Sequence, residues 1–129
     1  MTHVSATIGP ENYCTILSAN AHTLLADEPV LNGGQGKGFS PHELMAASLA
    51  ACTVITLKMY ADRKGWDIHG IKVEVSIQIE EHKFASFQCM IEVPLHITEP
   101  QRNRMLEISR NCPLHQILVN TSKITSSIK

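Results

Sequence analysis

A long apolar segment with helix signals at both ends limits the folds that this chain can adopt. Ser40 precedes Pro41, and Glu43 follows three residues after the serine, which is the pattern of a capping box at a helix start. Gly65 is a stop signal, so we expect a helix from Ser40 to about Lys64. The residues in between leave almost no polar face. A helix that is apolar all round must be buried on all sides.

A large core, a subunit interface or a membrane could bury such a helix. The apolar run Leu44–Leu57 is too short to span a bilayer, and His42, Glu43 and Lys58 flank it. A domain of 129 residues has difficulty enclosing a helix completely. The sequence therefore predicts association of subunits and no membrane partner.

Short β-branched runs precede this helix. Val4–Ile8, Tyr13–Leu17 and Ala21–Ala26 are separated by turn signals, so we expect a hairpin or a three-stranded meander. The segment Asn32–Phe39 then carries four glycines and predicts a mobile connector or lid. The residue after Lys37 is a glycine rather than Ser or Thr, and no apolar strand leads in, which disfavours a phosphate-binding loop.

The segments after the long helix alternate with period two. Ile71–Glu80 and Phe87–Leu95 alternate apolar and polar residues, with a break at Glu81–Ser86. This pattern predicts a long antiparallel pair with one face on the core and the other toward water. Near the end of the chain, we expect Lys123–Ile128 to return as a strand.

Two shorter helices complete the predicted fold. Thr98 and Gln101 repeat the capping-box pattern and open a helix to about Ser109, and Asn111–Leu118 opens another. The residues expected on the inner side of the first of these helices are Met105, Leu106 and Ile108. The order of strands, long helix, strands and helices predicts an α+β fold. The length predicts one domain, residues 1–129.

Charge and cysteine content narrow the function. Eleven basic and twelve acidic residues give no clustered positive charge for nucleic acid or an anionic membrane. No basic segment followed by an apolar run at the N-terminus reads as a secretion signal, so we expect a cytoplasmic protein. Four cysteines without CxxC pairs are then interpreted as free or redox-active thiols.

The four cysteines differ in their expected surroundings. Cys112 precedes Pro113, a residue preferred in the first helical turn, so its thiol lies at or beside an N-cap, where free N–H groups favour the thiolate. Cys52 lies in the apolar helix, where burial raises the pKa of a thiol and a structural role is the simpler interpretation. Cys14 and Cys89 lie on alternating strands and are interpreted as packing residues.

The remaining polar and aromatic residues indicate no cofactor. The seven histidines include no HExxH pattern, and Cys112 with His115 supplies two ligands at most, so we expect no metal. Trp66, Tyr60 and Phe39 are interpreted as core or interface aromatics. A solvated helix face with paired charges is expected for Arg102, Arg104, Glu107 and Arg110.

Two sets of residues resemble the OsmC/Ohr family. The first comprises the glycine-rich loop, "SPHEL" at the helix start, Cys52 eleven residues after the proline, the basic helix end "KMYADRKGW" and the strand "IKVEVSI". The second is the Cys-Pro pair of "RNCPLHQIL", which begins at Cys112. Together they extend from about Asn32 to Leu118.

This resemblance implies an intertwined homodimer in which sheets wrap two long central helices and the active sites lie at the subunit interface. It implies that Cys52 attacks an organic hydroperoxide to form a sulfenic acid, that Cys112 resolves it as a disulfide, and that an external dithiol restores both thiols. The family's peroxidases carry a glutamate directly after the helix proline. Here that residue is His42, and the neighbouring Glu43 is the candidate catalytic acid.

The peroxidase branches also carry a strand arginine near the N-terminus, whereas no arginine occurs here before Arg63. His42, Lys58 and Arg63 of either subunit are candidates for the missing cation. Two hypotheses stay open: a hydroperoxide reductase in oxidative stress defence, and a dimeric protein that binds a small apolar ligand or senses redox state with little turnover. The paired cysteines favour the first and the missing arginine favours the second. A third hypothesis leaves both thiols inert.

Overall fold

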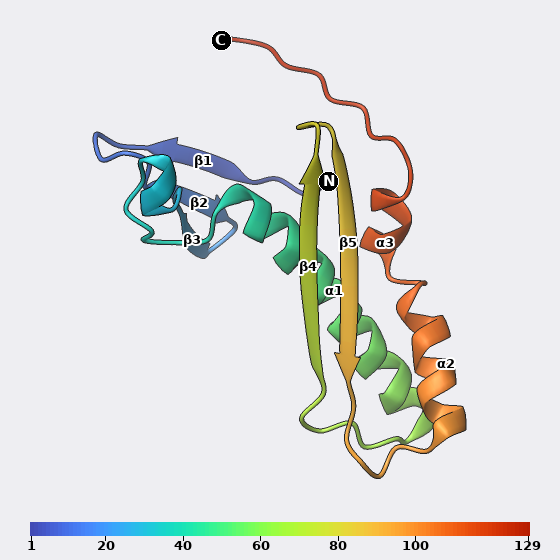
Figure 1. The fold of residues 1–129 in the computed structure, drawn as a ribbon. Coiled ribbons are helices and arrows are strands. Elements are labelled where there is room, and N and C mark those ends of the chain that lie inside the picture. The colour runs from blue at the N-terminus through green and yellow to red at the C-terminus, as the bar shows by residue number, and fades with distance from the viewer. The chain divides into compact units, whose positions relative to one another are not determined.

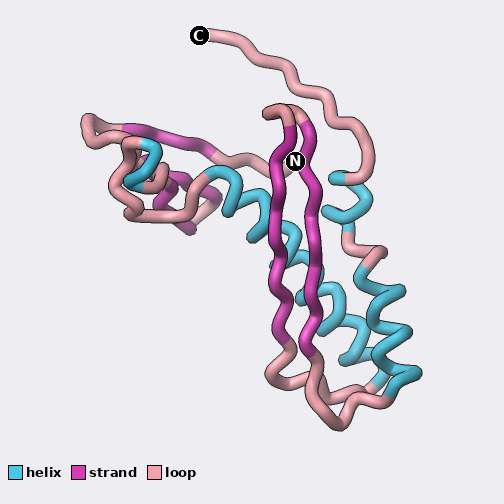
Figure 2. Tube along the Cα trace, viewed as in Figure 1, coloured by secondary structure: helices cyan, strands magenta, loops and turns pink.

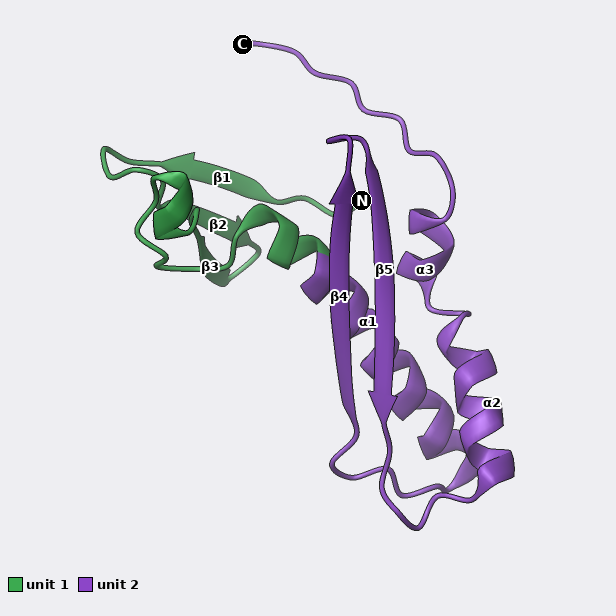
Figure 3. Cartoon of the chain, in the orientation of Figure 1, with its two compact units in different colours: residues 1–45 green, residues 46–129 purple.

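The structure is a computed structural model that describes all residues from 1 to 129. It contains a three-stranded and a two-stranded antiparallel sheet, one long helix and two shorter α-helices (Figure 1). The predicted α+β class is confirmed. The chain divides into two compact units, residues 1–45 and residues 46–129 (Figure 3).

The first unit contains an antiparallel meander. Its strands are β1 (Ser5–Ile8), β2 (Thr15–Ala19) and β3 (His22–Ala26), paired in chain order as predicted. The turn between β2 and β3 places Asn20 at a positive φ of 55°, a conformation that asparagine tolerates better than most residues. Within the three strands only Ala26 is buried, so the meander has almost no apolar core of its own.

A buried carboxylate organises the glycine-rich loop. Asp27 is only 3% exposed. Its Oδ1 accepts hydrogen bonds from the amides of Tyr13 (3.0 Å) and Glu28 (2.8 Å), and its Oδ2 accepts from Gln35 (3.3 Å) and Lys37 (3.1 Å). Burial raises the pKa of this carboxyl, but the four amide donors outweigh burial and hold the pKa below the ordinary aspartate value.

Two glycines let this loop close on itself around the short helix η1 (Val30–Asn32). A Cβ atom on Gly34 would lie 2.0 Å from the carbonyl oxygen of Glu28, and one on Gly38 would lie 2.2 Å from that of Leu25. These distances leave no room for a side chain. The segment is therefore a packed turn rather than the open connector predicted from its glycines.

The long helix α1 (Pro41–Lys64) has the predicted limits. The Ser40 amide donates to Glu43 Oε1 (2.8 Å) and the Glu43 amide donates to Ser40 Oγ (3.2 Å), which completes the capping box. Gly65 ends the helix at a φ of 71°, and the amides of Gly65 and Trp66 donate back to carbonyls of the last turn. Both ends are therefore set by local signals.

The second unit contains a β-hairpin of strands β4 (Lys72–Glu80) and β5 (Phe84–Glu92). The predicted antiparallel pair is confirmed, but β5 begins three residues before the expected Phe87 and ends three residues before the expected Leu95. The connection Glu81–Lys83 is short because two of its residues adopt positive φ. No other strand of the chain pairs with either edge of this hairpin.

Helices α2 (Glu99–Ser109) and α3 (Pro113–Leu118) follow the hairpin and also match the prediction. The Thr98 amide donates to Gln101 Oε1 (2.9 Å) and the Gln101 amide donates to Thr98 Oγ1 (3.3 Å). This second capping box fixes the start of α2. Leu106 was expected on the inner side of α2, but it is 50% exposed because consecutive helical residues point about 100° apart.

The apolar core lies in the second unit, where α1 and α2 pack beside the hairpin (Figure 1). Its buried members are Leu57, Tyr60, Ala61, Ile68, Ile97, Met105 and Ile108. Trp66 packs against this cluster with its ring 5.5 Å from that of Tyr60, so both are core aromatics as predicted. Phe39 is instead largely exposed. Arg104 donates from Nε to Tyr60 Oη (2.9 Å) and also pairs with Glu107, as expected, whereas Arg102 and Arg110 form no ion pair.

Residues 119–129 form no helix or strand (Figure 2). The strand predicted at Lys123–Ile128 is therefore wrong for the single chain. A β-strand needs a partner to satisfy its backbone groups, and none is present here. Ile124 and Ile128 are almost fully exposed.

By length and composition alone, α1 could cross a membrane. The apolar run Leu44–Leu57 alone is too short to span a bilayer, but the whole helix Pro41–Lys64 extends about 36 Å, which is enough for a span. Length alone therefore does not exclude a membrane span for α1, contrary to the prediction. The core helix of a soluble protein can be equally long and apolar, and Leu57 and Ala61 of α1 are fully buried in the core.

Candidate functional site

The structure brings two of the predicted site residues together. Cys52 lies in the middle of α1 and Cys112 lies directly before α3, and their side chains are in hydrogen-bonding contact. Both thiols are free. Cys112 is fully buried, whereas Cys52 is partly exposed. One thiol can therefore meet a solute while the other is positioned to attack its sulfur.

Local backbone geometry positions Cys112. The amides of Asn111 and Cys112 donate to carbonyls of the last turn of α2, which makes the connection between α2 and α3 tight. Cys112 is the N-cap of α3, and Pro113 occupies the first helical turn, as predicted. The sequence thus places this thiol at a rigid corner between two helices.

The electrostatic surroundings of Cys112 differ from the prediction. Burial raises the pKa of its thiol, and the adjacent Cys52 raises it further. Interactions with the amides of His115 and Leu114 lower the pKa, but by less. The expected thiolate at this N-cap is therefore wrong, because α3 has only six residues and the sulfur is shielded from water.

Glu43 is not part of the cysteine contact. Its carboxylate accepts the hydrogen bond from the Ser40 amide, and the interactions with Ser40 lower the pKa of Glu43. The side chain is therefore ionised at neutral pH and acts in the capping box of α1. Its role as the catalytic acid stays a prediction.

Two of the three candidate cations are engaged elsewhere. Lys58 forms an ion pair with Asp62, and the Arg63 guanidinium lies 5.9 Å from the centre of an aromatic ring on the same helix. His42 lines a small cavity in the first unit. No hydrogen bond or ion pair in the structure joins a basic side chain to Cys52. No group of three or more His, Cys, Asp or Glu side chains is arranged to hold a metal ion.

An apolar cavity of about 300 Å³ lies beside the cysteine pair in the second unit. Its lining includes Leu49 of α1, Phe87 and Cys89 of β5, and His115 of α3. Leu49 and His115 each stand about one helical turn from one of the paired cysteines. No motif in the sequence marks this wall, although the period-two pattern of β5 indicates that Phe87 and Cys89 share a face.

The other two cysteines are apart from the reactive pair. Cys14 is partly buried just before β2. Cys89 is exposed as a residue, so the predicted packing role is wrong for it. Its sulfur nevertheless lies against apolar neighbours, and this burial raises the pKa of the Cys89 thiol.

Comparison with protein families gives one match. The model of the OsmC family, described as OsmC-like protein, matches residues 34–127, a range that includes Cys52 and Cys112. A comparison with curated proteins finds no match.

Solved structures share the fold over most of the chain. A Psychrobacter arcticus protein, proposed to act in osmotic stress and detoxification responses, has 24% identity and a TM-score of 0.80, over 91% of this chain and 88% of that one. The organic hydroperoxide resistance protein OsmC of Legionella pneumophila has 18% identity, a TM-score of 0.66 and coverage of 92% and 88%. OhrB of Bacillus subtilis, an organic hydroperoxide resistance protein, has 17% identity and a TM-score of 0.64, over 91% of this chain and 89% of that one.

These TM-scores show that the chain shares its fold with these proteins.

Proposed function

The chain belongs to the OsmC-like protein family, and we propose that it reduces organic hydroperoxides with the thiols of Cys52 and Cys112, in defence against oxidative stress. The observation that carries this proposal is the contact between the two side chains. Their separation in the sequence makes a chance meeting of two free thiols uncommon. The hydroperoxide resistance proteins of similar fold support the same substrate class.

The reaction balances with these two cysteines and one external reductant. The Cys52 thiolate attacks the outer oxygen of the hydroperoxide, the O–O bond breaks, and the alkoxide takes a proton to leave as an alcohol. The Cys112 sulfur then attacks the sulfenic acid on Cys52, the S–O bond breaks, and water leaves as the disulfide forms. A dithiol returns two electrons and becomes oxidised. No bound cofactor takes part.

The cavity beside the pair supports an organic substrate. Leu49 and Phe87 offer an apolar wall to an alkyl or aryl group, whereas hydrogen peroxide has no group to place there. The partial burial of Cys52 also limits access of further oxidant to its sulfenic acid. We therefore expect a preference for organic hydroperoxides over hydrogen peroxide.

The exposed side of α1 supports an intertwined homodimer. Ile55 is 52% exposed and Met59 is 63% exposed, and both line an apolar groove of about 480 Å³ that continues to Ile68 and Ile71. Large apolar side chains gathered on one surface favour a protein partner. In this proposal residues 1–129 act as one cytoplasmic OsmC-like domain, and the second subunit supplies the basic group that Cys52 lacks.

Sedimentation tests the dimer. The wild-type protein should sediment as a dimer, and Met59→Glu should shift it toward the monomer. Met90→Glu is a matched control, because Met90 is equally exposed but lies outside this groove. Sedimentation of the wild-type protein as a monomer at all concentrations would exclude the homodimer.

A second function is favoured by the surroundings of the two thiols. The pKa of the Cys112 thiol is raised, and no basic side chain is bonded to Cys52 within the chain. Both features slow thiol chemistry. The alternative is therefore a dimeric protein that binds a small apolar ligand or senses redox state, with little or no peroxidase turnover.

A single-turnover experiment separates the two functions. Reduced protein is mixed with one equivalent of cumene hydroperoxide, and intact mass and free thiols are followed over seconds to minutes. Rapid loss of two thiols with a Cys52–Cys112 link in the peptide map supports the reductase. Thiols that stay titratable over many minutes support the ligand-binding or sensing function.

Cysteine variants test the assigned roles. Cys52→Ser should abolish peroxide reduction. Cys112→Ser should allow one turnover and then over-oxidation of Cys52, because no thiol is left to resolve the sulfenic acid. Cys14→Ser is the matched control and should keep full activity. Full activity in Cys52→Ser would exclude the mechanism.

A further inference from the structure

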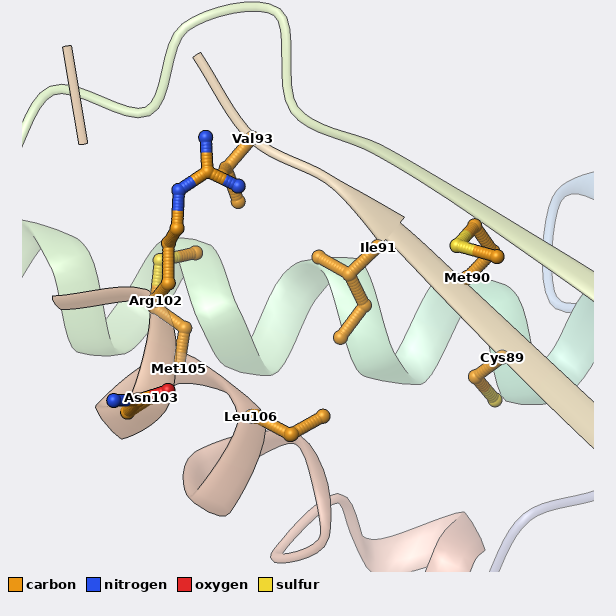
Figure 4. A pocket seen from close by; sticks show the side chains of 8 residues that line it. All are labelled: Cys89, Met90, Ile91, Val93, Arg102, Asn103, Met105 and Leu106. Carbon is orange, nitrogen blue, oxygen red and sulfur yellow. The ribbon is translucent and has the colours of Figure 1, made fainter. Parts of the chain in front are cut away.

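A second apolar groove lies between β5 and α2 (Figure 4). It has a volume of about 260 Å³ and belongs entirely to the second unit. Ile91 and Val93 form one wall, and Met105 and Leu106 form the other. Neither Cys52 nor Cys112 lines it, so its occupant need not take part in the thiol chemistry.

The two ends of this groove differ chemically. The guanidinium of Arg102 lies beside Val93 at one end, and Cys89 lies at the other, with Ile91 and Leu106 between them (Figure 4). The strand rise separates Cys89 from Val93 by about 13 Å. The groove therefore has a cationic end and an apolar path leading away from it.

The charge of Arg102 is uncompensated. None of the ion pairs or side-chain hydrogen bonds of the structure includes this guanidinium. Arg104, two residues later, is instead bound to both Tyr60 and Glu107. Of these two arginines, the one at the groove is free to bind an external anion.

Cys89 extends the apolar path. It also lines the cavity of about 300 Å³ that contains Phe87, so the two hollows share a wall on one face of β5. A chain longer than the first groove can therefore continue past Cys89.

We propose that this groove binds an amphipathic carboxylate, with its carboxylate on Arg102 and its alkyl chain along Ile91 and Leu106 toward Cys89. A single guanidinium presents a planar fork that matches a carboxylate with two hydrogen bonds and balances one negative charge. A hollow of about 260 Å³ is the size of a small ligand, whereas a protein partner needs a broad surface of about 800 Å². The carboxylate end of this site, at Arg102, lies in a groove that neither Cys52 nor Cys112 lines.

Binding of octanoate and octanol tests the two ends separately. Titration calorimetry should show saturable binding of octanoate. Arg102→Gln should weaken octanoate about tenfold or more, the cost of a lost charged hydrogen bond, and should leave octanol unchanged. Arg110→Gln is the matched control, because Arg110 is also exposed but does not line the groove.

The apolar wall is tested in the same way. Leu106→Gln should weaken octanoate and octanol alike, because it removes apolar contact from the alkyl chain. Leu95→Gln is its control, since Leu95 is almost fully exposed and outside the groove.

Alkylation of the wild-type protein gives a readout that needs no variant. Octanoate should slow the reaction of Cys89 with iodoacetamide and leave Cys14 unaffected, because only Cys89 lines the groove. Lack of saturable octanoate binding, or equal losses in Arg102→Gln and Arg110→Gln, would overturn the proposal.

Discussion

Each of the two compact units of this chain is stabilised internally in a different way. In the first unit the only buried residues are Ala26 and Asp27, and the Asp27 carboxylate gathers four backbone amides around itself. In the second unit Leu57 and its neighbours form an apolar cluster of seven buried side chains. The first unit depends on the path of its backbone, whereas the second depends on side-chain volume.

This contrast indicates how each unit fails. Removal of methyl groups destabilises a packed core. In a loop closed by hydrogen bonds, by contrast, an added atom in the wrong place is more damaging than a lost one. Substitutions chosen for each unit can therefore test whether the contrast is real.

The largest effect is expected in the apolar core. Leu57→Ala should lower the free energy of unfolding by about 2–5 kcal/mol, because Leu57 is fully buried and its loss leaves a cavity. Denaturant unfolding measures this change. Leu95→Ala, at a residue that is 96% exposed, should change it by less than about 0.5 kcal/mol. A similar small loss in both variants would contradict a tightly packed core.

A smaller effect is expected from adding one methyl group to the loop. Gly34→Ala should destabilise the protein by about 1–3 kcal/mol, because the new Cβ meets the Glu28 carbonyl. Faster amide hydrogen exchange at Gln35 and Lys37 should accompany it. Gly9→Ala is the control, since a Cβ there meets nothing within 4 Å. Unchanged exchange in Gly34→Ala would show that the loop is not closed in solution.

The two capping boxes allow a matched comparison between the units. Ser40→Ala and Thr98→Ala should each cost about 1 kcal/mol in thermal or denaturant unfolding. Because α1 begins in the first unit and carries Leu57 into the core of the second, both variants should shift the same transition. A Ser40→Ala effect on a separate, earlier transition would show that the units unfold independently.

The smallest effect is local and depends on pH. The folded-state pKa of Asp27 lies below its ordinary value, so its stabilising contribution is complete above the unfolded-state pKa and is lost as the pH falls through the folded-state pKa. Protection of the Gln35 and Lys37 amides should therefore decrease only in strong acid. Asp27→Asn should remove this pH dependence. Loss of protection near neutral pH would contradict the assignment.

Local signals allowed much of the fold to be predicted from the sequence. The limits of α1 and α2 follow from residues within one turn of each end, such as Ser40, Gly65 and Thr98. The β4–β5 turn is shorter than predicted. It contains no glycine or asparagine to mark a tight turn, and its positive φ values fall on Glu81 and His82.

Features that join distant segments could not be predicted. The donors to Asp27 come from three separate stretches of chain, and no pattern in the sequence connects them. The pairing of Cys52 with Cys112 was implied by a family resemblance and not by spacing. The pKa of Cys112 was predicted in the wrong direction because its complete burial depends on packing that the motif alone does not reveal.

The position of Cys112 at the start of α3 also has a spectroscopic consequence. The amides of Leu114 and His115 interact with its sulfur, so their NMR frequencies depend on the charge and bonding of that atom. Formation of a disulfide would change both frequencies without any added label. These two amides therefore make α3 an internal reporter of the oxidation state of the protein.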